Sequence, residues 1–226
     1  MNPESLVVCD DVARTYGTGP AAVVAVHGSS CIVGSGARIA IAGPSGSGKS
    51  TLLHLMAGLE RPTRGTVSWP ALGSGDERAQ DIGVVFQSPS LIPALDVSEN
   101  TALPLVIAGV AEPDRAQRVA EALALLGIDQ LAGKLPEEIS GGQAQRVAVA
   151  RVLAQRPRLL LADEPTGQLD RAAGQRLLDA LLDATDHLAA ALVVTTHDKA
   201  VIERLETRWT MHEGRLHTTI APAVPS

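Results

Sequence analysis

The chain has 226 residues, of which 45% are hydrophobic, and a formal net charge of −6. This length can bury the core of one large α/β domain, and no apolar run reaches the roughly 18 residues that span a bilayer. One Tyr, one Phe and the lack of a Lys/Arg cluster argue against nucleic acid as a partner, because such surfaces are basic and aromatic. Met1–Ser5 holds no basic segment before an apolar stretch, and Cys9 and Cys31 are isolated in the sequence. We therefore expect a cytosolic protein with two small buried or reduced thiols and no metal bound by cysteine.

Short strands separated by turn residues predict an antiparallel start to the chain. Leu6–Cys9 and Ala22–Val26 are typical of strands on either side of the turn-rich segment 16–20, and another strand is expected near Ser30–Val33. Tyr16 lies just before the turn. Its ring could stack on a nucleotide base there or simply pack half-buried against the sheet.

A phosphate-binding loop is predicted after the strand Ile39–Ala42, and it leads into a helix at 51–57. The glycines of the loop let successive N–H groups point at phosphate oxygens, Lys49 adds a positive charge, and the Ser50 hydroxyl is suited to magnesium. An ordinary turn rich in Gly and Ser is the alternative. The sequence matches G-x-x-x-x-G-K-[ST], and its residues are Gly43, Pro44, Ser45, Gly46, Ser47, Gly48, Lys49, Ser50 and Thr51.

Another buried strand delivers a glutamine to its carboxyl end. Thr66–Trp69 resumes a strand after the helix, and Pro70–Gln80 is interpreted as a short, Gly-rich, polar connector. Ile82–Phe86 is then a compact buried strand that ends at Gln87. The carboxyl ends of strands in open α/β sheets face the ligand crevice, so Gln87 is placed to reach a metal ion or a water. A plain loop glutamine is the alternative.

The pattern becomes helical from Ser88 to Ala132, and a second possible anion site follows. A helix is expected at 144–155, preceded by Ser140, Gly141, Gly142 and Gln143, and Ser140 is a good N-cap residue. Such a helix start binds anions, although a well-capped helix without a ligand is the alternative. The helices expected before it are Val97–Ile107, Pro113–Leu126 and Ile128–Ala132.

Two carboxylates follow the next apolar strand. Leu159–Glu164 is typical of a strand buried on both faces, and Asp163 and Glu164 stand at its carboxyl end. There they suit a magnesium partner and a general base beside a bound phosphate, and a solvated acid pair is the alternative.

A histidine ends the last buried strand. A helix at 175–188 precedes the strand Ala191–Thr196, which brings His197 to the same crevice edge. A lone histidine is more often structural, which is the alternative. A hairpin of 209–212 and 215–218 is expected to close the chain.

With SGGQ at Ser140–Gln143, the sequence resembles the ATP-binding subunit of an ABC transporter over nearly its whole length. The family order is followed by Tyr16, GPSGSGKST, Gln87, SGGQ, LLLADE with Gln168–Asp170, and Thr196-His197-Asp198. Within the family, the sequence is most similar to the macrolide-export, lipoprotein-release and cell-division ATPases in the segments SPSLIPALDVSENTALPL and DEPTGQLD. Two departures are Ile139 in place of the usual Leu and a short, weakly basic connector at 70–81.

The resemblance implies an α/β fold. We expect a P-loop NTPase core of the RecA-like type with a parallel sheet, an N-terminal antiparallel β subdomain and a helical insertion. The chain would form one domain over residues 1–226. Its nucleotide-binding core would comprise 1–87 and 157–226, and its helical subdomain with SGGQ would comprise 88–156.

The resemblance also implies which residues serve ATP within one subunit. Adenine would stack on Tyr16, while the loop at 43–51, with Lys49, would hold the phosphates. Glu164 would act as general base, and His197 would contact the γ-phosphate and position the attacking water. The residues implied as magnesium ligands are Ser50, Gln87 and Asp163.

The implied partners are a second copy of the chain and a membrane permease. Ser140, Gly141, Gly142 and Gln143 would reach the γ-phosphate held by the other subunit, so that ATP joins the two. Ser88–Pro104 would dock the permease, unless Leu91, Ile92 and Leu95 merely cover the core of the helical subdomain. The protein would then lie at the cytoplasmic face of the cell membrane and use ATP hydrolysis for export or extraction. The alternatives are control of a cell-envelope enzyme through the permease, and import.

Overall fold

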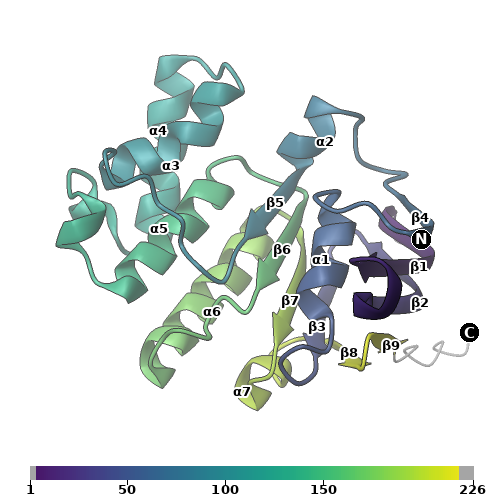
Figure 1. Cartoon of the computed structure of the whole chain (residues 1–226). Helices are drawn as coiled ribbons and strands as arrows, with labels where there is room; N and C mark the ends of the chain where they lie inside the picture. The colour runs from purple at the N-terminus through teal and green to yellow at the C-terminus, as the bar shows by residue number, and fades with distance from the viewer. Residues whose placement is uncertain (1–3, 219–226) are drawn as a thin grey trace, which may run out of the picture. The chain divides into compact units, whose positions relative to one another are not determined.

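The computed structural model describes residues 4–218, which form two compact units (Figure 1). The first unit consists of the residues up to Leu72 together with those from Ala191 onward, and the second is Gly73–Ala190. The division expected from the sequence, with 88–156 as a helical subdomain, stays a prediction.

The first unit begins with a three-stranded antiparallel sheet in the order β2-β1-β4. Its strands are β1 (Ser5–Tyr16), β2 (Val23–Gly34) and β4 (Arg64–Ser68). The antiparallel start is confirmed, but the expectation of two separate strands at 22–26 and 30–33 is wrong, because β2 is continuous. β1 also extends beyond the predicted end at Cys9. It is the central strand, and pairing with a neighbour on each side overrides the weak strand propensity of its polar residues.

Parallel strands form the second part of the same unit. β3 (Arg38–Ala42) pairs in parallel with β7 (Ala191–Thr196) and with β8 (Thr207–His212). β9 (Arg215–Thr218) returns antiparallel beside β8, which confirms the predicted hairpin. All residues of β7 are buried, as expected for a strand covered on both faces.

Helix α1 (Lys49–Ala57) anchors the phosphate loop in the core of this unit. Leu52, Leu53, Leu55 and Met56 are fully buried, and each such side chain contributes about 1.5–3 kcal/mol to stability. The indole N–H of Trp69 donates to the carbonyl oxygen of Met56 at 2.8 Å, which ties the chain after β4 to α1. The unit also contains the short helix α7 (Lys199–Ile202) and the 3-10 turn η1 (Gly19–Ala21).

The second unit combines a parallel strand pair with helices. β5 (Ile82–Val85) pairs with β6 (Leu159–Asp163), and Val85 lies opposite Ala162. No helix within residues 4–218 is both long enough and apolar enough to cross a membrane. The helices of this unit are α2 (Asp76–Asp81), α3 (Val97–Ile107), α4 (Glu112–Leu125), α5 (Gly141–Leu153) and α6 (Arg171–His187), with 3-10 turns η2 (Asp129–Leu131) and η3 (Pro136–Glu138).

The longer helices predicted for this unit are present, but the helix expected at Ile128–Ala132 is wrong, because only the 3-10 turn η2 forms there. α3 has the predicted bounds, whereas α5 and α6 begin earlier than predicted, because Ser140 and Asp170 cap the turns before 144 and 175. The polar connector expected at 70–80 contains a short helix that the sequence did not predict, because 76–81 form α2. The backbone carbonyl of Asp81 accepts from the N–H of Arg158 at 2.9 Å, so a contact far along the chain holds the end of this short helix.

Candidate functional site

The phosphate loop follows β3 and is packed so closely that two of its glycines have no room for a side chain. A Cβ atom on Gly43 would lie 2.1 Å from the carbonyl oxygen of Met211, and one on Gly48 would lie 2.1 Å from the carbonyl oxygen of Ala25. Gly48 has a φ of 99° and is the N-cap of α1, a conformation that favours glycine. The loop is thus held between β2 and β8. The first N–H groups of α1 have no acceptor within the helix, which is the arrangement that binds phosphate.

Lys49 lies inside this loop rather than in solvent. Its side chain is 4% exposed, and Nζ donates to the carbonyl oxygens of Gly43 at 2.9 Å and Pro44 at 3.0 Å. Within residues 4–218, the buried hydroxyl of Ser47 has no hydrogen-bond partner. Buried charges and orphaned hydroxyls are costly, so the loop fits an anionic ligand that would complete both. The loop residues that remain exposed are Pro44, Ser45, Gly46 and Ser50, while Thr51 is half-buried.

His197 lies beside the start of the phosphate loop. β3 and β7 pair in register, with Ala42 opposite Thr196, so the residues that follow, Gly43 and His197, leave the sheet at the same edge. His197 is exposed there. The structure therefore brings together two predicted site residues that are more than 140 positions apart in the sequence.

Tyr16, the last residue of β1, has one neighbour that the sequence did not predict. The guanidinium of Arg14 lies 4.6 Å from the centre of the Tyr16 ring and forms an ion pair with Glu60 at 2.7 Å. A cation above an aromatic face is attracted by the ring electrons. Tyr16 still has 38% of its surface exposed, so part of the ring is open to a ligand.

In the second unit, Gln87, Asp163 and Glu164 lie at one edge of the β5–β6 pair. Val85 is opposite Ala162 in parallel register, so the residues that follow both strands leave at the same end. Asp163 is 7% exposed, and Gln87 is exposed. Glu164 has a φ of 42°, a left-handed conformation that costs a residue other than glycine about 1–2 kcal/mol. Strain of this kind occurs at sites where a side chain must be aimed.

The start of α5 has the cap that the sequence predicted. Ser140 Oγ accepts from the Gln143 N–H at 3.3 Å, and Gln143 Oε1 accepts from the Ser140 N–H at 2.8 Å. Gly141 and Gly142 occupy the first helical positions, whose N–H groups have no acceptor within a helix. A Cβ on Gly142 would be 3.4 Å from Leu169, so the SGGQ segment lies near the segment that follows β6.

Two residues of α5 with long-range contacts were missed at the sequence level. Gln145 and Arg151 donate hydrogen bonds to backbone carbonyl groups in the segment that carries Gln87. The position of Arg151 among apolar residues of the helix could have indicated a tertiary contact, because a charged group on a buried helix face needs a partner.

The first unit thus brings the phosphate loop and His197 to one edge of a sheet, and Tyr16 ends a strand of the same unit. The second unit brings Gln87, Asp163 and Glu164 to one edge of the β5–β6 pair and also contains the capped start of α5. Within residues 4–218 there is no group of three His, Cys, Asp or Glu side chains that could alone hold a metal ion. The oxygens of Ser50, Gln87 and Asp163 are of the hard type that Mg²⁺ prefers.

Comparison with known proteins identifies relatives for nearly the whole chain. Residues 26–167 match the family model described as ABC transporter. The lipoprotein-releasing system ATP-binding protein LolD of Legionella pneumophila (strain Lens) is 39% identical over 212 residues, which are 90% of this chain and 93% of that protein. The LolD protein of Pseudomonas fluorescens is 36% identical over 96% of this chain and 99% of its own length.

Solved structures also match nearly the whole chain. One is the dimeric post-hydrolysis state of the ATP-binding cassette MJ0796 bound to ADP and Pi, with a TM-score of 0.84 and 33% identity over 95% of this chain and 99% of that one. Another is cbiO1 from Clostridium perfringens, part of the transporter complex cbiONQ, with a TM-score of 0.83 and 27% identity over 95% of this chain and 87% of that one. The predicted α/β fold and the predicted family resemblance are both confirmed.

Proposed function

This chain belongs to the ABC transporter family as an ATP-binding, ATP-hydrolysing subunit, and on that premise we propose that two copies close on ATP to drive a separate permease that extracts or exports a lipoprotein. The similarity to the lipoprotein-releasing ATP-binding proteins over nearly the full length carries this proposal. The dimeric MJ0796 structure supports the use of two copies. The permease would hold the protein at the cytoplasmic face of the membrane.

The phosphate loop and its neighbours would hold ATP in the first unit. Adenine would stack on the exposed part of Tyr16. The N–H groups at the start of α1 and the ammonium of Lys49 would bind the phosphates, exchanging the hydrogen bonds of Lys49 to Gly43 and Pro44 for phosphate oxygens. His197, next to the loop, would contact the γ-phosphate and orient a water.

Magnesium is the metal that the donor set fits. Ser50 would contribute its hydroxyl, Gln87 its amide oxygen and Asp163 a carboxylate oxygen, directly or through water. When bound, the ion would supply positive charge that stabilises the negative charge developing on the phosphates.

Glu164 would act as the general base. It follows Asp163 directly, and its left-handed backbone, unusual for a residue other than glycine, supports a functional role. The carboxylate would accept a proton from the water that attacks the γ-phosphorus. Asp163, the more buried of the two, would stay a metal partner.

Ser140 to Gln143 would bind the nucleotide held by the other copy. The cap already occupies the N–H of Gln143, which leaves the N–H groups of Gly141 and Gly142 for a γ-phosphate. One chain then supplies half of each of two sites. ATP would hold two copies together, and hydrolysis would release them.

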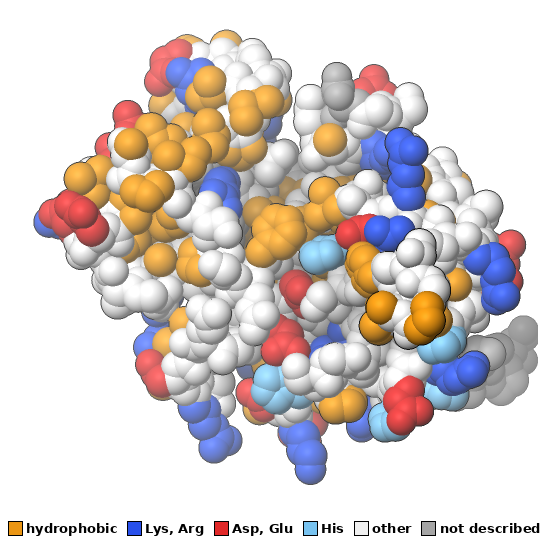
Figure 2. Space-filling model, in the orientation of Figure 1, with side chains coloured by type: hydrophobic (Ala, Val, Ile, Leu, Met, Phe, Trp, Pro, Cys, Tyr) orange, Lys and Arg blue, Asp and Glu red, His pale blue; other side chains and the backbone are white. Residues whose placement is uncertain are grey.

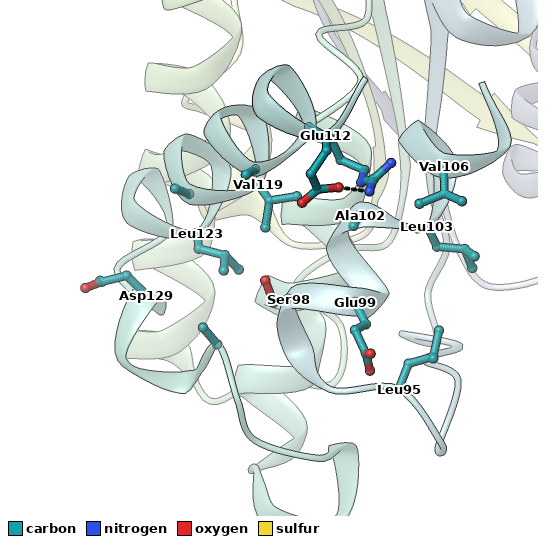
Figure 3. Close-up of a pocket in the computed structure, with 14 residues that line it drawn as sticks. Leu95, Ser98, Glu99, Ala102, Leu103, Val106, Glu112, Val119, Leu123 and Asp129 are labelled. Carbon is teal, nitrogen blue, oxygen red and sulfur yellow. Dashed lines mark ion pairs between the residues drawn. The ribbon is translucent and has the colours of Figure 1, made fainter. Parts of the chain in front are cut away.

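Part of the segment 88–104 expected to dock the permease lines a groove between α3 and α4, and we propose this groove as the docking surface. It forms a cavity of about 600 Å³, and Figure 3 shows apolar side chains of both helices facing it. Val106 is 50% exposed and Ile107 is 79% exposed, and Figure 2 shows hydrophobic side chains gathered over these helices. Glu99 and Asp129 lie at the rim, where Glu112 also pairs with Arg115. An apolar groove with an acidic rim fits a short amphipathic helix that carries a basic residue.

The experiment is purification of the tagged chain from membranes, identification of the permease, and reconstitution of both in vesicles that contain a lipoprotein. We expect ATP-dependent release of the lipoprotein and stimulation of ATPase activity by the permease. A permease that leaves the lipoprotein in place while it stimulates ATPase activity would refute the substrate class. A chain that purifies without any permease would refute the transport role.

A further inference from the structure

Helix α5 contacts the segment after β5 through three side-chain hydrogen bonds. Gln145 Nε2 donates to the carbonyl oxygen of Phe86 at 3.2 Å. Arg151 donates from Nη1 to the carbonyl oxygen of Ser90 and from Nη2 to that of Pro89, both at 3.0 Å. The donors are about 60 residues further along the chain than the acceptors, so these are tertiary contacts.

The three acceptors enclose Gln87. Phe86 precedes it, and Pro89 and Ser90 follow two and three positions later. Gln87 itself is exposed and follows the end of β5, so α5 holds the backbone on both sides of it.

Both donors are polar groups withdrawn from water, and their desolvation is unfavourable unless hydrogen bonds replace those to water. Gln145 is 3% exposed, and burial lowers the pKa of the Arg151 guanidinium. A buried amide or a partly desolvated cation is unfavourable unless it is hydrogen-bonded. The planar fork of Arg151 satisfies two carbonyl groups at once, and charge-assisted hydrogen bonds are stronger than neutral ones.

The helix that carries these donors begins at Ser140. Residues Val147–Leu153 of α5 are buried except for the half-buried Arg151, so the helix is packed into the core of its unit. The same helix therefore contacts the Gln87 segment at one place and carries the SGGQ cap at another.

We infer that Gln145 and Arg151 are positioning residues that fix Gln87 to helix α5, so that Gln87 and the Ser140–Gln143 end of the helix move as one body. The clamp itself stands on the contacts above. Its catalytic consequence rests on the proposed function, in which Gln87 binds magnesium and Ser140–Gln143 bind the nucleotide of the second copy.

The first test measures hydrogen exchange in the nucleotide-free protein. Gln145→Glu places a carboxylate against the Phe86 carbonyl, and Arg151→Met removes both hydrogen bonds to 89 and 90. We expect exchange in the segment 86–91 to rise about tenfold in each variant, because each loses one or two hydrogen bonds that hold this segment. The matched controls Gln175→Glu and Arg176→Met, at exposed positions of α6, should leave it unchanged. Exchange at 86–91 that is equal in the variants and the wild type would overturn the inference.

Arg151→Lys separates the clamp from a general loss of folding. It keeps the charge but lacks the planar fork, so exchange at 86–91 should lie between the wild-type and Arg151→Met values. The rest of α5 should exchange at the wild-type rate. Faster exchange throughout α5 in Arg151→Lys would instead assign the residue to general stability and overturn the inference.

The second test is a double-mutant cycle with Gln87→Ala. Arg151→Met should lower kcat about tenfold in the wild-type background and raise the magnesium concentration that gives half-maximal binding of a fluorescent ATP analogue. In the Gln87→Ala background it should have no further effect on either quantity, because residues that act as a unit are not additive. Additive effects would overturn the inference. A wild-type chain that neither binds the analogue nor hydrolyses ATP would refute the proposed function, while the exchange experiment would still test the clamp.

Discussion

We expect the Gly48→Ala variant to have a lower Tm than the Gly46→Ala variant, although both glycines lie in the phosphate loop. Both glycines have positive φ, 99° and 76°, so each substitution carries a backbone cost of about 1–2 kcal/mol. They differ in their surroundings. A Cβ at Gly46 meets nothing within 4 Å, whereas one at Gly48 would lie 2.1 Å from the carbonyl oxygen of Ala25, below the 3.0 Å that real Cβ atoms keep.

At Gly48 the clash with the Ala25 carbonyl oxygen lowers the free energy of unfolding further, beyond the backbone cost. The carbonyl of Ala25 belongs to β2 and cannot rotate away as a side chain can, so α1 or β2 must shift. Forcing an extra methyl group into packed structure costs about 1–3 kcal/mol. Gly48→Ala should therefore lose this amount in addition to the loss that it shares with Gly46→Ala.

Thermal unfolding of the nucleotide-free proteins, followed by circular dichroism, measures the difference. In a chain of this size each kcal/mol lowers the Tm by about 2–4 °C. We expect a moderate decrease for Gly46→Ala and a clearly larger one for Gly48→Ala. Equal Tm values for the two variants would refute the conclusion that β2 closes over the loop.

The other predictions concern the chemistry of the site and the two thiols. Glu164→Gln should bind ATP with wild-type affinity, lower turnover about 10²–10⁴-fold, the range of general base catalysis, and trap an ATP-bound dimer; normal steady-state hydrolysis would contradict the assignment. Ser140→Arg should abolish ATP-dependent dimerisation in light scattering while it spares nucleotide affinity, and unimpaired dimerisation would argue against a role across the interface. A hydrogen bond with Cys9, burial, and the charge of Cys9 all raise the pKa of Cys31, so stability should be constant below the unfolded thiol pKa of about 8.5 and fall as pH rises above it. Iodoacetamide should modify both thiols only in denaturant; fast modification of the native protein at pH 8 would show that the buried pair opens.

Interactions between residues that are close in the sequence explain most of the correct predictions. The strand, phosphate loop and helix from Ile39 to Ala57 depend on neighbouring residues and on glycine conformation. The Ser140 cap depends on hydrogen bonds to Gln143, three residues away. Such short-range interactions are encoded directly in the order of residues.

Errors occurred where distant segments decide the outcome. β2 was predicted as two strands, since the residues between them have low strand propensity, but pairing with β1 makes it continuous. Helix α2 was not predicted within the polar connector at 70–80, and its end is held by Arg158. Local preference is weak in both segments, and tertiary contacts override it.

The sequence by itself determined the family, the α/β class and the candidate residues, because motifs and periodicity follow from the order of amino acids along the chain. Only the tertiary structure decided which of these residues lie together. Parallel pairing of β3 with β7 brings His197 beside Gly43, and pairing of β5 with β6 brings Gln87 beside Asp163 and Glu164. The hydrogen bonds from α5 to the Gln87 segment join residues about 60 positions apart. Which distant groups meet depends on how the strands pair and the helices pack, and one sequence contains no direct record of those contacts.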